Sequence, residues 1–342
     1  MRSSRVNPID HARPVSDGAS DVEPGPSTGA YARLPQRGRK FLEDLRSAPP
    51  LGSLTIIEER ARMLQGQNAS FENYPVELIE VTSAACPVYV IRPRDAHEDL
   101  PITFYLHGGG WVLGGLETHT MLLCQLALQS RRAIVFVDYP RAPETQFPKL
   151  VHVCEEAIQD TLRVAAELRL LADGFVLAGD SSGGNIALSY ILALQRTGHA
   201  APAALVLLYP VTDHAMDSAS YIEFADNPNL SRQAMAWFWE QYIPEAPVRD
   251  DALASPLRAG VESFHAFPPT LIVTCEYDVL RDQGEALAMK LVQAGVEVTA
   301  VRWLGALHGF LVTEDLLSGP AAQRCVDFVA QYCRRLNGAC RE

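Results

Sequence analysis

Short runs of apolar residues recur along the chain and predict eight β-strands. They cover residues 76–81, 87–91, 102–106, 133–137, 175–178, 205–208, 270–274 and 296–303. The first two runs are typical of a hairpin, whereas several later ones are apolar at every position, as in parallel strands buried on both faces. Helical patterns lie between the later strands, at residues 117–129, 151–171, 185–197, 281–294 and 321–336. This alternation predicts an α/β fold with a mostly parallel sheet flanked by helices.

The segment before the first strand has a different pattern. Residues 1–31 are rich in Pro, Gly, Ser and Asp, so we expect a disordered tail there. Apolar residues at helical spacing then begin near Lys40, and again after Thr55, whose hydroxyl suits an N-cap. Pro49-Pro50 separates the two patterns. Residues 32–72 are therefore predicted to form two N-terminal cap helices.

Residues 73–342 are predicted to form the core, with one interruption. Residues 212–254 contain no strand-like run, but they include the helical aromatic cluster Met235-Ala236-Trp237-Phe238-Trp239. We expect this segment to be a helical cap inserted into the core. Part of its aromatic surface is expected only to pack the cap onto the sheet.

Charge narrows the classes of partner. The 342-residue chain is 48% hydrophobic, enough for a sizeable core, and it carries 29 basic and 41 acidic residues, a net charge of −12. This excess of negative charge repels phosphate backbones and anionic membranes, so we expect no nucleic-acid partner. No apolar run is long enough to span a bilayer, and we expect no stable membrane insertion.

Cysteine spacing and the N-terminal pattern bear on location and metals. The seven cysteines form no C-x-x-C pair, so the sequence predicts no zinc or other metal site and favours free thiols in a reducing compartment. The first thirty residues lack the apolar segment of a secretory signal. We therefore expect a cytoplasmic protein, for which a homodimer is one assembly that the sequence allows.

The first chemical motif is Gly179-Asp180-Ser181-Ser182-Gly183, which matches G-x-S-x-G between a predicted strand and a predicted helix. In that setting a sharp turn exposes the serine hydroxyl at the carboxyl end of the sheet. The turn crowds the backbone on both sides, so glycine is required at positions 179 and 183. The sequence therefore predicts Ser181 as the nucleophile of an acyl-transfer enzyme.

The second motif, His107-Gly108-Gly109-Gly110, follows the strand at 102–106. Glycines let backbone N–H groups approach a substrate, so we predict Gly108 and Gly109, together with Ser182, as donors to the oxyanion of a tetrahedral intermediate. His107 is expected to brace this loop by hydrogen bonding. A phosphate-binding role is excluded, because no G-K-[ST] sequence follows the glycines.

The base and the carboxylate that would act with Ser181 should follow the last two predicted strands. Where a G-x-S-x-G turn joins a strand to a helix in such a sheet, the order along the chain is nucleophile, acid, histidine. His308, in Leu307-His308-Gly309-Phe310, is therefore the predicted base. Glu276, Asp278 and Asp282 follow the preceding strand, and Asp278 is favoured because it lies in the loop. Structural roles are expected for the upstream histidines His119, His152 and His214.

Taken together, the motifs resemble the hormone-sensitive-lipase-like (bacterial family IV) esterases of the α/β-hydrolase superfamily. The resemblance runs from about residue 39 to the C-terminal helix. It rests on the segments His107–Trp111, Asp138–Glu144, Gly179–Gly184, Tyr209–Pro210, Ser255–Leu257, Asp278–Asp282 and His308–Phe310.

The resemblance implies an α/β-hydrolase fold and a cofactor-independent carboxylesterase that acts on small-molecule esters with short to medium acyl chains. It implies the triad Ser181, Asp278 and His308, with the oxyanion donors given above. We assign substrate binding to the aromatic residues Trp111, Trp237, Phe238 and Trp239.

Three positions depart from the family pattern. The arginine of the usual D-Y-R-L-A-P-E sequence is displaced to Arg141, which puts its usual contacts in doubt. Ser182 replaces an alanine after the nucleophile, where only the backbone is needed. Val279 replaces a proline after the acid, which leaves Asp278 less rigidly held.

Two other functions are alternatives for a protein of this fold. An N- or O-deacetylase of a specialised metabolite would share the whole mechanism, and amide against ester substrates would separate it from a carboxylesterase. A non-catalytic small-molecule receptor of this fold would resemble an esterase but lack the histidine, which is present here as His308.

Overall fold

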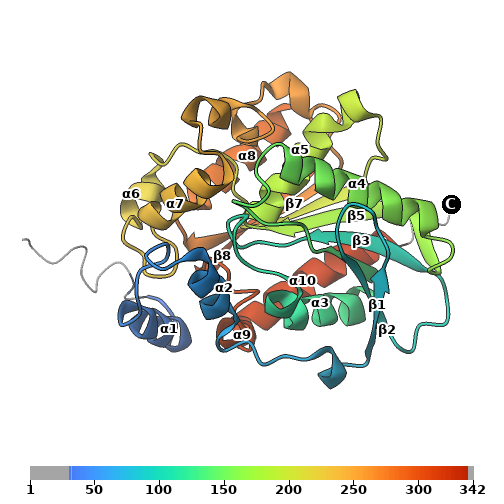
Figure 1. Cartoon of the computed structure of the whole chain (residues 1–342), viewed down its shortest axis with the longest axis horizontal. Helices are drawn as coiled ribbons and strands as arrows, with labels where there is room; N and C mark the ends of the chain where they lie inside the picture. The colour runs from blue at the N-terminus through green and yellow to red at the C-terminus, as the bar shows by residue number, and fades with distance from the viewer. Residues whose placement is uncertain (1–30, 32, 338–342) are drawn as a thin grey trace, which may run out of the picture. The chain divides into compact units, whose positions relative to one another are not determined.

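A central sheet of eight strands organises the chain in the computed structural model, which describes residues 31 and 33–337 (Figure 1). The predicted tail at 1–31 therefore lies outside the described residues, apart from Tyr31. Along the sheet the order is β1-β2-β4-β3-β5-β6-β7-β8. The strands are β1 (Val76–Val81), β2 (Val88–Pro93), β3 (Leu100–Leu106), β4 (Ala133–Val137), β5 (Leu170–Asp180), β6 (Ala204–Leu208), β7 (Thr270–Tyr277) and β8 (Val298–Leu307).

Strand direction follows from the connections. β1 and β2 pair as the predicted antiparallel hairpin, and β2 pairs antiparallel with β4. Every other neighbouring pair is parallel. β3, β4 and β6 are buried at every position, as expected for central strands covered on both faces. The predicted fold, a mostly parallel eight-stranded sheet flanked by helices, is confirmed.

Helices cover both faces of the sheet. One layer holds α3 (Leu116–Ser130) and α10 (Pro320–Arg335), which pack against each other, and the opposite layer holds α4 (Lys149–Val164), α5 (Ser182–Thr197) and α8 (Arg281–Gln293) (Figure 1). α10 buries Cys325, Val329 and Cys333 along one stripe, as its pattern predicts. None of the helices among residues 33–337 combines the length and apolar character that a membrane span requires.

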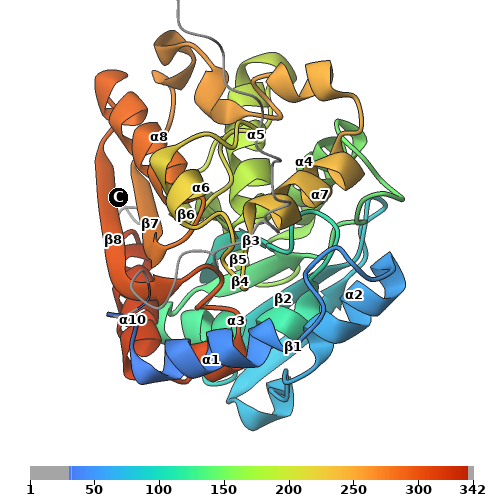
Figure 2. The same cartoon turned by 90° about the vertical axis from the view of Figure 1, so that its left-hand side faces the viewer.

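The remaining helices gather at the end of the sheet where the parallel strands finish (Figures 1 and 2). They are α1 (Gln36–Arg46), α2 (Ile56–Leu64), α6 (Ala219–Glu223), α7 (Arg232–Tyr242) and α9 (Glu314–Leu317). α2 begins as predicted at Thr55, whose hydroxyl accepts the Glu58 N–H while the Glu58 carboxylate accepts the Thr55 N–H. Residues 212–254 hold α6, α7 and a short 3-10 helix at Ala246–Asp250, and they contain no strand.

The prediction of a helix over 151–171 is wrong at its end. α4 stops at Val164, and β5 begins at Leu170, five residues before the predicted strand. Arg169 has a φ of +57°, a left-handed conformation that cannot continue a helix. Leu170 then pairs with Leu100 of β3, and a register shift separates this pairing from the main part of the strand.

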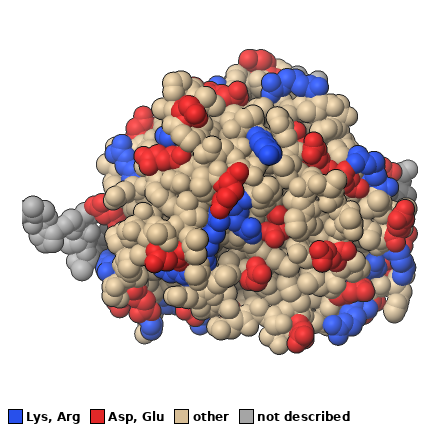
Figure 3. All heavy atoms as spheres, viewed as in Figure 1, with Lys and Arg blue, Asp and Glu red and all other residues tan. Residues whose placement is uncertain are grey.

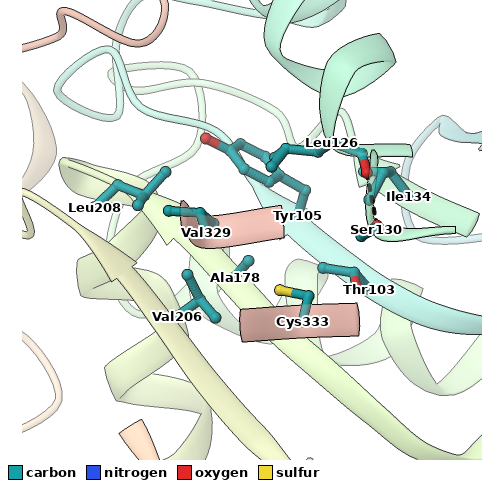
Figure 4. Close-up of a pocket in the computed structure, with 10 residues that line it drawn as sticks. All are labelled: Thr103, Tyr105, Leu126, Ser130, Ile134, Ala178, Val206, Leu208, Val329 and Cys333. Carbon is teal, nitrogen blue, oxygen red and sulfur yellow. Dashed lines mark hydrogen bonds between the residues drawn. The ribbon is translucent and has the colours of Figure 1, made fainter. Parts of the chain in front are cut away.

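The sheet packs tightly against α3 and α10. A void of about 10 Å³ lies between these helices and β3 to β6, with room for about one water molecule (Figure 4). Ten residues line it: Thr103, Tyr105, Leu126, Ser130, Ile134, Ala178, Val206, Leu208, Val329 and Cys333. The three residues with hydroxyls in this lining, Thr103, Ser130 and Tyr105, already have hydrogen-bond partners in Arg132, Leu126 and Asp180 respectively, so this void is a packing defect of the core.

Candidate active site

Ser181 occupies a strained turn between β5 and α5. Its φ of +52° and ψ of −119° are unusual for a residue with a side chain, and such a conformation costs about 1–3 kcal/mol. Two hydrogen bonds hold the turn: the Ser181 N–H donates to the Leu208 carbonyl at 2.9 Å, and the Val211 N–H donates to the Ser181 carbonyl at 3.0 Å. The neighbouring strand β6 therefore fixes the direction in which the hydroxyl points.

The two flanking glycines have no room for a side chain. A Cβ at Gly179 would lie 2.5 Å from the backbone carbon of Gly183, and a Cβ at Gly183 would lie 2.0 Å from the Leu106 carbonyl oxygen. These distances are far inside van der Waals contact. The predicted requirement for glycine on both sides of the nucleophile turn is confirmed.

The structure brings Ser181, His308 and Asp278 together from three strand ends. His308 Nε2 lies 3.0 Å from Ser181 Oγ, and His308 Nδ1 lies 2.7 Å from Asp278 Oδ2. Asp278 is fully buried, and its other oxygen accepts the Leu280 N–H at 2.9 Å. Because a carboxylate only accepts, Nδ1 carries the imidazole proton and Nε2 presents its lone pair to the serine hydroxyl.

The two other carboxylates weighed for this role make different bonds. Glu276 accepts the Gly305 N–H at 2.6 Å, and Asp282 accepts the Ser220 N–H at 2.7 Å. Ser220 also donates its hydroxyl to the Val279 carbonyl at 2.7 Å. The residue that replaces the family's proline is thus held from α6, which offsets the rigidity that a proline would supply.

The glycine loop differs from the prediction at its first residue. The Gly108 N–H donates to Asp180 Oδ1 at 2.8 Å and is not free for a substrate, so the prediction of Gly108 as an oxyanion donor is wrong. Gly109 and Gly110 follow with φ values of +113° and +60°. Among the described residues, no hydrogen-bond acceptor is found for the N–H groups of Gly109, Gly110 and Ser182. These three are the candidate oxyanion donors.

His107 braces this loop, as expected. Its Nδ1 donates to the Gly108 carbonyl at 2.7 Å, and its ring stacks on Tyr139 with centroids 4.0 Å apart. The Tyr139 hydroxyl donates to the His107 carbonyl at 2.6 Å. Burial, reinforced by electrostatic interaction with the neighbouring His119 and Arg141, holds the pKa of His107 well below its ordinary value. The ring therefore stays neutral and positions the backbone.

Two of the four aromatic residues assigned to substrate binding are packed away. Trp111 and Trp239 are fully buried with ring centroids 4.7 Å apart, and Trp111 stacks on Tyr242 at 4.3 Å. A side chain without exposed surface cannot line an open pocket, so the assignment of Trp111 and Trp239 to substrate binding is wrong. Their rings join α7 to the loop that follows the glycines.

The other two aromatic residues lie at the contacts between the cap and the loops. Phe238 is 4% exposed and lies over Gly110, where an added Cβ would come within 2.1 Å of its ring. Trp237 is partly exposed and covers Gly52, the turn before α2. Their rings are 5.1 Å apart. Substrate binding stays a prediction for this pair.

Two arginines form hydrogen bonds and ion pairs with the loops after β3 and β4, which the sequence did not predict. The displaced Arg141 donates to the Gly114 carbonyl and to Asp138, both at 2.6 Å. Arg60 of α2 donates to the Val112 carbonyl at 2.9 Å and makes a two-bond ion pair with Glu144 at 2.7 and 2.8 Å. Each of these two arginines is paired with a carboxylate, and on the face drawn in Figure 3 basic and acidic side chains are interspersed.

Two cap asparagines also hold the site, and sequence analysis missed them. The Asn229 side-chain amide donates to the His308 carbonyl at 2.7 Å, and the Asn227 amide donates to the Tyr277 carbonyl at 3.2 Å. The segment between α6 and α7 is therefore bonded to the loops of both the histidine and the acid. An Asn-Pro-Asn sequence is typical of any turn, so it carried no functional signal.

Comparison with known proteins agrees with this architecture. A family model described as the α/β-hydrolase fold matches residues 103–312. The chain is 36% identical over 299 residues to the ethyl acetate hydrolase of Pseudomonas putida, covering 84% of this chain and 91% of that protein. It belongs to the α/β-hydrolase family. Within that family its motifs are those of the hormone-sensitive-lipase-like branch.

Other members of the family extend the comparison. A carboxylesterase of Mycobacterium tuberculosis is 35% identical over 227 residues, which covers 66% of this chain and 71% of that protein. The crystal structure of a thermostable esterase from Pseudomonas putida superposes with a TM-score of 0.84 at 34% identity, over 88% of this chain and 97% of that one. This α/β-hydrolase therefore shares both sequence and fold with esterases along most of its length.

Proposed function

We propose that this α/β-hydrolase is a carboxylesterase that hydrolyses small-molecule acyl esters without a cofactor. The observation that carries the proposal is the unbroken hydrogen-bond chain from Ser181 Oγ through His308 to Asp278, beside three N–H groups that have no acceptor among the described residues. The printed activities of its relatives, an ethyl acetate hydrolase and a carboxylesterase, support an ester substrate.

The reaction follows from the order of these bonds. Ser181 Oγ attacks the ester carbonyl as its proton moves to His308 Nε2, and Asp278 stabilises the imidazolium. The N–H groups of Gly109, Gly110 and Ser182 donate to the oxyanion of the tetrahedral intermediate. Its collapse breaks the bond to the alcohol, which leaves with the proton from His308. A water molecule then attacks the acyl-enzyme by the same route, releasing the acid and restoring the serine.

The cap sets the acyl length that we propose. Phe238 lies over Gly110, so its ring is next to one of the proposed oxyanion donors, and the neighbouring Trp237 covers the turn at Gly52. These bulky rings at the site favour short to medium acyl chains. Short acyl chains do not require a long apolar groove.

A series of p-nitrophenyl esters from acetate to decanoate tests the proposal. We expect turnover that is fastest with the shorter members, and a Ser181→Ala variant whose kcat is lower by at least about 10⁴-fold. A fluorophosphonate probe should label the parent protein at Ser181 and leave the variant unlabelled. Ester turnover at the parent rate in Ser181→Ala would overturn the mechanism.

The two alternative functions are separated by the same material. A receptor would bind small molecules without acylation, and the bonded Ser181, His308 and Asp278 give no reason for it. A deacetylase would cleave N-acetyl amides or acetyl esters of a specialised metabolite. Matched pairs of acetyl amides and acetyl esters decide this point, and we expect the esters to be turned over faster.

Location and assembly are proposed from the sequence. The six cysteines among the described residues are all free and buried, which supports a reducing compartment such as the cytoplasm. A homodimer stays a prediction.

A further inference from the structure

Asp180 is a buried carboxylate placed directly before the proposed nucleophile. It is 2% exposed, and among the residues that the structure describes its one ion-pair partner is His119, with no lysine or arginine beside it. A carboxylate removed from water in this way must be satisfied by hydrogen-bond donors, or its burial is strongly unfavourable. The proposed reaction gives this group no chemical step.

Three donors converge on one oxygen of this carboxylate. Asp180 Oδ1 accepts the Gly108 N–H at 2.8 Å and the Tyr105 hydroxyl at 3.0 Å, and His119 Nε2 lies 3.2 Å away. They come from the glycine loop, from β3 and from the first turn of α3. The second oxygen is close to Gly108 as well, since a Cβ there would lie 2.2 Å from Oδ2.

The bond to Gly108 bears directly on the two residues that follow it. It fixes the peptide unit between His107 and Gly108, directly before Gly109 and Gly110, both of which have positive φ. A Cβ at Gly109 would lie 2.3 Å from the Leu113 carbonyl oxygen, so the turn is tight as well as left-handed. The N–H groups of Gly109 and Gly110 have no acceptor among the described residues. Their direction therefore depends on how the preceding peptide unit is held.

His119 is itself held in one orientation. Its Nδ1 lies 2.8 Å from the Thr118 hydroxyl and 3.1 Å from the Gly115 carbonyl. Because Asp180 can only accept, Nε2 carries the proton in the contact between them. With the Tyr105 hydroxyl, this donor partly offsets the negative charge of Asp180, which would otherwise oppose the developing oxyanion.

We propose that Asp180, held by His119 and Tyr105, is a positioning residue that sets the oxyanion loop by binding the Gly108 N–H. This inference rests on the proposed esterase function and assigns Asp180 no contact with the substrate. Its removal should leave substrate binding nearly unchanged and slow the chemical step. The loss in kcat should come from weaker stabilisation of the oxyanion, because the N–H groups of the loop donate to that charge.

The first test compares Asp180→Ala with Asp180→Asn, using p-nitrophenyl acetate. Asn keeps an oxygen that can accept the Gly108 N–H, whereas Ala keeps none. We expect Asp180→Ala to lower kcat by about 10²-fold with KM within about threefold of the parent, and Asp180→Asn to recover most of that loss. A trifluoromethyl ketone, which adds to the serine as an oxyanion, should bind Asp180→Ala more weakly by the factor lost in kcat/KM.

The second test uses variants of His119 and Tyr105, and it applies even if circular dichroism shows that Asp180→Ala does not fold. His119→Gln retains an N–H donor and His119→Leu does not, so kcat should fall about tenfold more in the leucine variant, again at constant KM. Tyr105→Phe, which leaves the Gly108 bond intact, should lose less than Asp180→Ala.

The outcomes separate this inference from the proposed function. A folded Asp180→Ala variant with parental kcat and ketone affinity, or equal kcat in His119→Gln and His119→Leu, would overturn the positioning role. Absence of ester turnover in the parent protein, or full turnover in Ser181→Ala, would instead overturn the esterase proposal on which it rests.

Discussion

At the scale of single residues, the contact between Asp278 and His308 sets the position of the imidazole proton on which the proposed mechanism depends. The carboxylate holds the proton on Nδ1 at 2.7 Å and leaves Nε2 free for Ser181. Asp278→Asn would present an amide donor there and favour the opposite tautomer. We expect kcat to fall by about 10⁴-fold with little change in KM, measured with p-nitrophenyl acetate.

Glu276→Gln is the matched control for that substitution. Glu276 lies two residues before Asp278 and bonds to Gly305, so its loss should leave kcat within about threefold of the parent. Equal losses in the two variants would show that Asp278 has no special relation to His308.

Neighbouring tryptophans on α7 should behave differently. Trp239 is fully buried against Trp111, so Trp239→Ala should lower the free energy of unfolding by about 3–5 kcal/mol in urea titrations. Trp237 is partly exposed at the turn before α2, so Trp237→Ala should cost less stability and move the preferred acyl chain toward longer esters. An unchanged chain-length profile in Trp237→Ala would contradict the predicted role of Trp237 in substrate binding.

The proximity of residues can be predicted from sequence where strand order alone determines it. Ser181, Asp278 and His308 follow three strands of one parallel sheet, and such strand ends meet at one edge. Sequence-based prediction failed at Gly108, because spacing along the chain does not reveal which N–H a buried side chain will bind. It failed at Trp111 and Trp239 for a related reason, since aromatic residues at a cap serve packing as readily as binding.

At the scale of elements, α2 is bonded across the glycine loop and the loop after β4. Arg60 reaches the Val112 and Ala142 carbonyls at 2.9 and 3.0 Å as well as the Glu144 carboxylate. Arg60→Ala removes these bonds, whereas Glu144→Gln removes only the charge of an exposed partner. We expect a loss of about 1–2 kcal/mol of unfolding free energy for Arg60→Ala and under about 1 kcal/mol for Glu144→Gln.

Thermal and urea unfolding of the two variants measure this difference. If Glu144→Gln costs as much stability as Arg60→Ala, the ion pair and not the bonds to the two carbonyls joins α2 to the core. Equal stability of all three proteins would mean that α2 contributes little to holding the loops.

Elements were predicted best where the apolar pattern is continuous. β3, β4 and β6 agree closely with their apolar runs because both faces of each strand are covered. The first half of β5 was missed, since Leu170 to Gly174 mixes apolar and polar residues after a left-handed Arg169. The bonds from Asn227 and Asn229 to the Tyr277 and His308 carbonyls depend on tertiary placement, which no local pattern encodes.

At the scale of the whole molecule, the fold removes its thiols from solvent. Six cysteines among the described residues are buried and free: one in the turn between β1 and β2, one on β7, and four on helices of both layers. Burial raises the pKa of Cys86 and of Cys124 to about 12, and that of Cys333 to about 11. Because the thiolate is the reactive form, these side chains should be inert near pH 8 while the core stays packed.

Iodoacetamide at pH 8 followed by peptide mass spectrometry checks this expectation. Cys86, Cys124 and Cys333 should remain unmodified in the native protein and react fully in urea, so that the rate of alkylation reports opening of the core. The pKa values set the sign: raising the pH toward 11 should speed the reaction first at Cys333, if the fold persists there. Rapid alkylation of Cys86 in native protein at pH 8 would show that the edge of the sheet near β2 opens without global unfolding. Cys86 would then not belong to the tightly packed core.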